Sequence, residues 1–206
     1  MKRFILFICC CLLTGVVFSQ EADDSGEEEG GMPEIISSSY DFHEPGAMQM
    51  KVALGVDVPL FNQDADGRII KNTGMHTGGL LSLGFTYFFT SSINMGFDAV
   101  FNFLPTTGSN LLFYVPLTVR GGYQFVWGKF EIPVNLGAGI AIQTCANRNY
   151  YGLILRPETG IYYRQGPDWS FGVGTVWNFI PQWYKDKNDT RYGNILEISA
   201  AVRFHF

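Results

Sequence analysis

Ten charged residues stand at alternating positions inside otherwise apolar segments, which makes them the first candidates for chemistry. Five are basic and five are acidic: Lys51, Asp57, Asp98, Arg120, Glu131, Arg156, Glu158, Arg164, Glu197 and Arg203. Charges that leave water must be paired or must change their protonation state. Equal numbers of the two signs favour a network of ion pairs that plugs an interior. The alternative is a polar gate or proton relay that opens on demand.

Nucleophilic catalysis needs a histidine beside a hydroxyl group and a carboxylate, and the sequence offers one loose candidate. Of the three histidines, only His76 lies in a predicted loop with these residue types nearby. Its neighbours are Thr73, Thr77 and Asp66. A lone histidine in a loop is more often simply exposed. We therefore assign no catalytic residues and predict that the protein is not an enzyme.

The cysteines give no sign of a metal centre or a disulfide framework. Cys9, Cys10 and Cys11 lie in the N-terminal apolar run, so removal of that run would leave only Cys145. A lipid anchor on the cysteine triplet would need a longer apolar run before it. The chain also lacks a phosphate-binding glycine loop and a nucleic-acid motif. We predict no metal, no cofactor and no nucleic-acid partner.

The elements that must position the charged residues show strict period-2 alternation, which is the signature of β-strands. In the last segment one face consists of Leu196, Ile198, Ala200, Val202, Phe204 and Phe206. Eight such segments are predicted, each long enough for a tilted strand to cross a bilayer. They cover residues 47–59, 79–90, 93–104, 111–125, 130–143, 153–164, 169–180 and 194–206. The predicted fold is all-β, an eight-stranded antiparallel up-and-down transmembrane β-barrel.

The distribution of glycine and charge decides which face points inward. The charged residues share their face with six glycines, and the opposite face is almost uninterrupted Leu, Val, Ile, Phe, Tyr and Trp. The glycines are Gly84, Gly96, Gly137, Gly139, Gly172 and Gly174. A narrow barrel interior must hold small residues beside a few large ones. A soluble sandwich or lipocalin-type barrel would instead be apolar inside and would not expose so large an apolar surface.

The N-terminal region is predicted to serve export. Residues 1–19 combine Lys2 and Arg3 with a short apolar run and resemble a secretory signal peptide. Residues 20–46 carry nine acidic residues and no Lys or Arg, which predicts a disordered segment before a barrel of residues 47–206. Long and short connections alternate between the strands, and outer-membrane barrels place the short turns and both ends in the periplasm.

The chain ends with Val202-Arg203-Phe204-His205-Phe206, an alternating segment with a terminal Phe. It resembles the C-terminal signal, here Phe204 and Phe206, by which an assembly machinery recognises outer-membrane proteins. The signal peptide, the eight strands and this ending together resemble small eight-stranded outer-membrane barrels, the OmpW-like and OmpA-transmembrane-domain-like proteins. The resemblance implies insertion into the lipid of the outer membrane of a diderm bacterium.

Inward positions nearest the long loops are apolar and would form a cup: Leu80, Leu104, Leu112, Ile154, Ile180 and Ile195. OmpW-like barrels are held to pass small hydrophobic compounds from a pocket on the extracellular side. The resemblance thus implies a narrow channel or binding barrel for small hydrophobic molecules, whereas packing of folded loops is the plainer explanation of the cup.

Two other classes of function remain open. A structural or adhesive surface barrel could use basic loop residues to contact lipopolysaccharide phosphates or a host polyanion. These residues are Arg68, Lys71, Arg148, Lys185, Lys187 and Arg191. A lipid A-modifying barrel enzyme, the third class, would depend on His76. The oligomeric state is open.

Overall fold

Long β-strands make up most of the computed structural model, which describes residues 43–70, 74–106, 110–145, 148–183 and 190–206. The strands are β1 (Met48–Asp64), β2 (Ile69–Ile70), β3 (Gly78–Phe88), β4 (Ile93–Pro105), β5 (Leu111–Trp127), β6 (Phe130–Cys145), β7 (Arg148–Arg164), β8 (Trp169–Gln182) and β9 (Arg191–His205). Among the described residues, no helix has the length and apolar character needed to cross a membrane. The predicted signal peptide and residues 20–42 lie outside the described residues.

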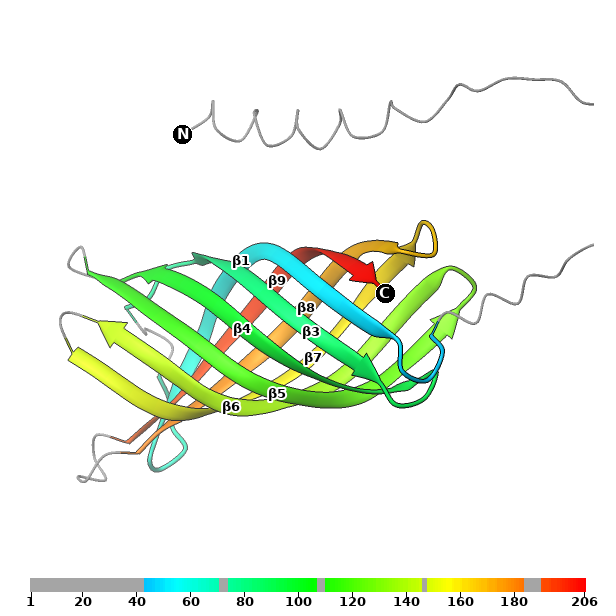
Figure 1. The fold of residues 1–206 in the computed structure, drawn as a ribbon. Coiled ribbons are helices and arrows are strands. Elements are labelled where there is room, and N and C mark those ends of the chain that lie inside the picture. The colour runs from blue at the N-terminus through cyan, green and yellow to red at the C-terminus, as the bar shows by residue number, and fades with distance from the viewer. Residues whose placement is uncertain (1–42, 71–73, 107–109, 146–147, 184–189) are drawn as a thin grey trace, which may run out of the picture. The chain divides into compact units, whose positions relative to one another are not determined.

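The described strands close into one ring in which every neighbouring pair is antiparallel. Each long strand pairs with the next along the chain, and β1 also pairs with β9. The two-residue β2 extends the end of β1 as a small hairpin, so eight long strands form the wall. Figure 1 shows the ring, with the C-terminal end of β9 at the end of the barrel that holds the short turns. The predicted eight-stranded antiparallel barrel is confirmed.

The barrel is apolar outside and polar inside, the reverse of a soluble fold. Alternate residues of each strand point outward, and large apolar side chains such as Leu54, Leu136 and Val173 are 59–64% exposed there. The inward positions are buried and include charged side chains such as Asp57 and Glu131, both 0% exposed. In lipid this arrangement removes the apolar surface from water, while ring closure satisfies the backbone hydrogen bonds.

The predicted strand ends are wrong at the end of the barrel that holds the long connections. Residues 144–152 were expected to form a loop, but the β6–β7 ladder continues to Cys145 opposite Arg148. The strand predicted at 47–59 likewise extends to Asp64, which pairs with Arg191 of β9. Antiparallel pairing satisfies the backbone wherever two chains run side by side, whereas alternation of apolar residues is required only within the membrane. The sequence pattern therefore misses strand that extends beyond the apolar band.

Prolines interrupt the hydrogen-bonded ladders at defined points. Three ladders each skip two pairs at a proline: β4–β5 at Pro116, β6–β7 at Pro133 and β7–β8 at Pro157. In β1 the register with β9 shifts between Pro59 and Phe61. Proline has no N–H to donate, so it is tolerated at such breaks and bulges.

Candidate functional site

The lumen holds all ten charged side chains that the sequence pattern places on the inward face. Nine are buried, with at most 8% of the residue exposed, and Arg164 near the end of the barrel is half-buried. They come from six strands, and their closest contacts divide them into three clusters. We call these the central cluster, the Arg156 cluster and the Glu131 cluster.

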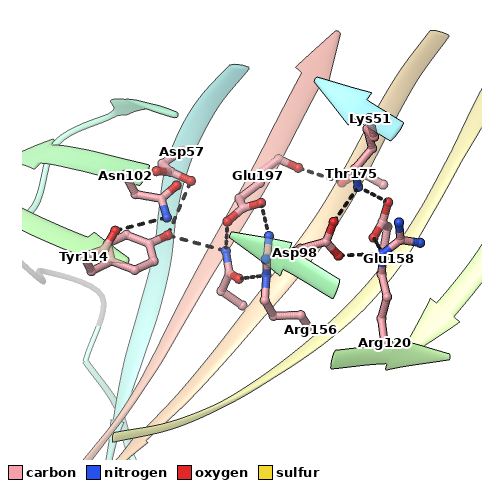
Figure 2. Close-up of polar contacts among 11 residues, drawn as sticks. Lys51, Asp57, Asp98, Asn102, Tyr114, Arg120, Arg156, Glu158, Thr175 and Glu197 are labelled. Carbon is pink, nitrogen blue, oxygen red and sulfur yellow. Dashed lines mark hydrogen bonds and ion pairs between the residues drawn. The ribbon is translucent and has the colours of Figure 1, made fainter. Parts of the chain in front are cut away.

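The central cluster consists of two cations and two anions that alternate around one another (Figure 2). Lys51 Nζ lies 2.8 Å from Glu158 Oε1 and 3.5 Å from Asp98 Oδ1. Arg120 Nε lies 2.6 Å from Asp98 Oδ2 and 3.8 Å from Glu158 Oε2, and Arg120 Nη2 donates to the Thr86 hydroxyl at 2.6 Å. The two carboxylates each contact both cations, so the cluster is neutral and connects β1, β3, β4, β5 and β7.

The seam between β1 and β9 makes these contacts across the lumen necessary. Its register places Lys51 directly opposite Arg203 and Asp57 directly opposite Glu197. Like charges directly opposite on neighbouring strands repel one another. Lys51 instead contacts Glu158, on β7 and 107 residues away in the chain. The partners that stabilise the seam therefore come from other strands of the barrel.

Glycines on the inward face leave the room that the large charged side chains occupy. A Cβ atom at Gly84 would collide with Asp98 Oδ1 and would lie 3.1 Å from Lys51 Cε. A Cβ atom at Gly96 would collide with the Phe85 carbonyl oxygen and would lie 3.3 Å from the guanidinium carbon of Arg120. The glycines thus permit the ion pairs of the central cluster in a narrow interior.

The Arg156 cluster joins one ion pair to a chain of neutral polar groups (Figure 2). Arg156 Nη2 lies 2.6 Å from Glu197 Oε2, and Arg156 Nε donates to Asn178 Oδ1 at 2.8 Å. Asn178 Nδ2 donates to Glu197 Oε1 at 2.6 Å and to the Tyr114 hydroxyl at 3.4 Å. The Tyr114 hydroxyl in turn donates to Asp57 Oδ1 at 3.5 Å. Tyr114 and Asn178 were not singled out from the sequence, because neutral polar residues are common on both faces of a strand.

Equal numbers of cations and anions do not produce one-to-one pairing in this lumen. Within the described part of the chain, Asp57 has no cation within ion-pair distance, and its Oδ2 atom is buried without a hydrogen bond. The Glu131 cluster has the opposite imbalance. Glu131 lies 3.1 Å from Arg164 Nη1 and 3.6 Å from Arg203 Nη1, so two guanidiniums face one carboxylate. Arg203 also lies 3.1 Å from the centre of the Tyr162 ring, a cation–π contact.

Two histidines belong to the Glu131 cluster, although the sequence pattern gave them no role. His43, expected in the acidic segment, is only 2% exposed and stacks on Phe88 with ring centres 3.9 Å apart. Its Nε2 atom lies 3.4 Å from Glu131 Oε1, and its ring centre lies 5.3 Å from that of His205. The alternation that places Arg203 inward also places His205 inward. His43 precedes the alternating segments, so no periodicity could indicate its position.

The residues of the apolar cup are buried, and most of them pack against one another. Leu104, Ile154, Ile180 and Ile195 are buried and form one cluster with Tyr114 and Ala141, and Leu112 packs against it. Leu80 is also buried, at 4% exposed, but is not part of that cluster. The structure thus brings together five of the six residues that the sequence placed in the cup.

The remaining candidate residues lie at the two ends of the barrel. Phe206 N–H donates to the Met48 carbonyl at 3.0 Å. The ring centres of Phe204 and Trp169 are 4.9 Å apart. His76 is exposed, as are Thr77, Asp66 and Arg68, while Arg191 is half-buried. Four of the proposed loop residues lie outside the described residues, namely Lys71, Thr73, Lys185 and Lys187, as does the side chain of Arg148.

Fold and lumen together define a small transmembrane β-barrel with an ion-paired interior. A sequence-family model matches residues 25–204. An uncharacterized protein of Treponema pallidum (strain Nichols) is 34% identical over 183 residues, which cover 84% of this chain and 83% of the relative. The chain therefore belongs to the same protein family as this Treponema pallidum protein.

Two solved structures with the same architecture are outer-membrane barrels. The outer membrane protein OprG from Pseudomonas aeruginosa has a TM-score of 0.55 and 14% identity, over 81% of this chain and 98% of OprG. Neisserial surface protein A has the same TM-score and identity, over 78% of this chain and 97% of that protein. At this identity the likeness concerns the fold, and it confirms the predicted resemblance to small eight-stranded outer-membrane barrels.

Removal of one cation from the central cluster should destabilise the barrel. In Arg120→Ala, Asp98 and Glu158 keep only Lys51 as a partner, and breaking a buried ion pair costs about 3–5 kcal/mol. Denaturant unfolding in lipid vesicles, followed by the gel shift between folded and heated protein, measures the loss. The exposed Arg68→Ala is the control and should change stability by less than about 0.5 kcal/mol. Equal stability of the two variants would show that the cluster contributes little.

Proposed function

We propose that this protein is an outer-membrane barrel whose lumen is closed by ion pairs, and that it acts as a structural and binding barrel and not as an open pore. The contacts among Lys51, Asp98, Arg120 and Glu158 carry this proposal, because they join strands on different sides of the lumen. Water and ions could pass only if these buried pairs separated, which would leave unpaired charges in a poorly solvated interior. We assign the barrel no catalytic role.

The proposed location is the outer membrane, reached after signal-peptide-dependent export. The apolar outer wall and the architecture shared with OprG and Neisserial surface protein A support it. In this arrangement the short turns and the segment before β1 face the periplasm, and the longer connections face outward. The basic loops could then meet a polyanion, such as lipopolysaccharide phosphates or a host polyanion.

Ion conductance tests the closed lumen. The purified protein in planar bilayers should show small or rare openings, because the charges of the central cluster neutralise one another inside the barrel. Arg120→Ala or Glu131→Ala should raise the leak, since each leaves former partners unpaired, whereas Arg68→Ala should behave as the unmodified protein does. A large, constant, porin-like conductance of the unmodified protein would contradict the proposal.

The C-terminal aromatic residues are proposed to be the signal for the assembly machinery. Deletion of Phe206 should leave aggregated or soluble periplasmic protein and little protein in the outer membrane. Phe206→Trp, which keeps a large aromatic side chain, is the matched control and should assemble. The measurement is the amount of heat-modifiable protein in outer-membrane fractions. Normal amounts after the deletion would mean that the ending has no role in assembly.

A second candidate function is the binding of a small hydrophobic molecule from the extracellular side. The apolar cup supports it, because a ligand could replace contacts that the cup residues now make with one another. Such a molecule would then have to leave sideways between strands, since charge fills the deeper lumen. The ladders are interrupted at Pro116, Pro133 and Pro157, which weakens strand pairing there.

Probe binding distinguishes a ligand-binding cup from a packed one. A hydrophobic fluorescent probe should bind the unmodified protein and should bind Leu112→Asp and Ile180→Asp at least tenfold more weakly. Leu111→Asp is the control, because Leu111 neighbours Leu112 on the same strand but is 52% exposed on the outer face. If the unmodified protein and both cup variants bind the probe equally, the cup serves only packing.

A further inference from the structure

Metal-binding residue types gather at the end of the barrel where the chain enters β1. His43, Glu131 and His205 are all buried, and they offer ligand atoms that lie within 4.8 Å of one another. In the described ranges of the chain, no other group of three or more His, Cys, Asp or Glu side chains is so placed. The three residues come from distant parts of the sequence: the segment before β1, the start of β6 and the end of β9.

We propose that His43, Glu131 and His205 bind a divalent transition metal ion such as Zn²⁺. Two imidazoles and one carboxylate are a donor set that holds Zn²⁺ with a water molecule in the fourth position. Bonds of about 2.0–2.2 Å in a tetrahedron place neighbouring ligand atoms about 3.3–3.6 Å apart. His43 Nε2 and Glu131 Oε1 are already 3.4 Å apart, so little movement is needed on that side of the site.

The contacts of His205 leave one of its nitrogens for the metal. Its Nε2 atom lies 2.9 Å from the Ser170 hydroxyl, whereas its Nδ1 atom is buried and has no hydrogen-bond partner. Histidine ligands usually hold their second nitrogen in a hydrogen bond, which fixes the ring and its tautomer. Ser170 is therefore the positioning residue for His205. On the other side, coordination by His43 Nε2 would replace its 2.7 Å contact with Gln124.

A hollow at the end of the barrel supplies a route to the site. It has a volume of about 450 Å³, and its lining includes His43, His205, Glu44, Asp168 and Arg164. Glu44 and Asp168 are exposed, so the hollow opens to solvent, while His43 and His205 are buried residues of its lining. This arrangement admits a hydrated ion from one direction and leaves space for a bound water molecule.

The charges near the site permit a divalent cation. Arg164 and Arg203 both contact Glu131 and oppose binding of a cation. Glu44 and Asp168 line the same hollow, so three carboxylates face two guanidiniums and the local charge is −1 with neutral histidines. A divalent ion would change the local charge from −1 to +1, so the size of the net charge would stay the same. The metal would join the segment before β1 to β6 and β9.

Zinc titration of the full-length barrel in detergent, after treatment with a chelator, tests the proposal. Calorimetry should show one Zn²⁺ bound per chain, and His43→Ala and His205→Ala should each weaken binding at least tenfold. His76→Ala is the matched control, because His76 is the third histidine of the chain and is exposed in a distant connection. It should bind as the unmodified protein does.

Two results of the zinc titration would overturn the proposed metal site. Absence of stoichiometric binding would do so, as would a loss of affinity that is equal in all three histidine variants. If His43→Ala or His205→Ala does not fold, the unmodified protein decides the matter. Its Co²⁺ complex should show the intense visible absorption of four-coordinate cobalt, and a weak six-coordinate spectrum would contradict the proposal. The conductance test with Arg120→Ala involves no residue of this site, so the closed lumen and the metal site stand or fall separately.

Discussion

Charge confined in a narrow, poorly hydrated lumen is the constraint on which the rest of this structure depends. An eight-stranded barrel has an interior that side chains fill, so each ionised group inside it needs partners within the protein. The need for partners is greatest where β1 pairs with β9, because that register places Lys51 directly opposite Arg203 and Asp57 directly opposite Glu197. The solution is contact across the lumen, in which Lys51 binds Glu158 on β7 and Arg203 lies over Tyr162.

The same contacts give the lumen two properties at once. They connect strands that are not neighbours in the sheet, as Arg120 of β5 does with Glu158 of β7, and they pair charges that are buried inside the barrel. Inward glycines such as Gly84 and Gly96 make this possible, because a larger residue would collide with the side chains or the neighbouring backbone. In the closed lumen that we propose, stability and closure would depend on the same residues.

The two ends of the barrel differ in chemistry. One end holds a buried apolar cluster that includes Leu104, Ile154 and Ile195. The other end holds Glu131 with two arginines and two histidines, beside a hollow that is open to solvent. The barrel therefore has one apolar end and one charged end, as is possible in a membrane protein whose two ends face different compartments. It also places the residues best able to hold a metal ion at the end where the chain enters and leaves the barrel.

The sequence by itself determined the eight long strands and the faces that they present, although not where each strand ends. Because side chains alternate along a strand, residues such as Leu196 and Glu197 must point to opposite sides, and the inward charges and glycines follow from period 2. Only the tertiary structure decided which charges meet, because partners such as Lys51 and Glu158 are 107 residues apart and their contact depends on barrel closure. It also decided the place of His43, which precedes every alternating segment. Its burial depends on the shape of the barrel end, which no local pattern encodes.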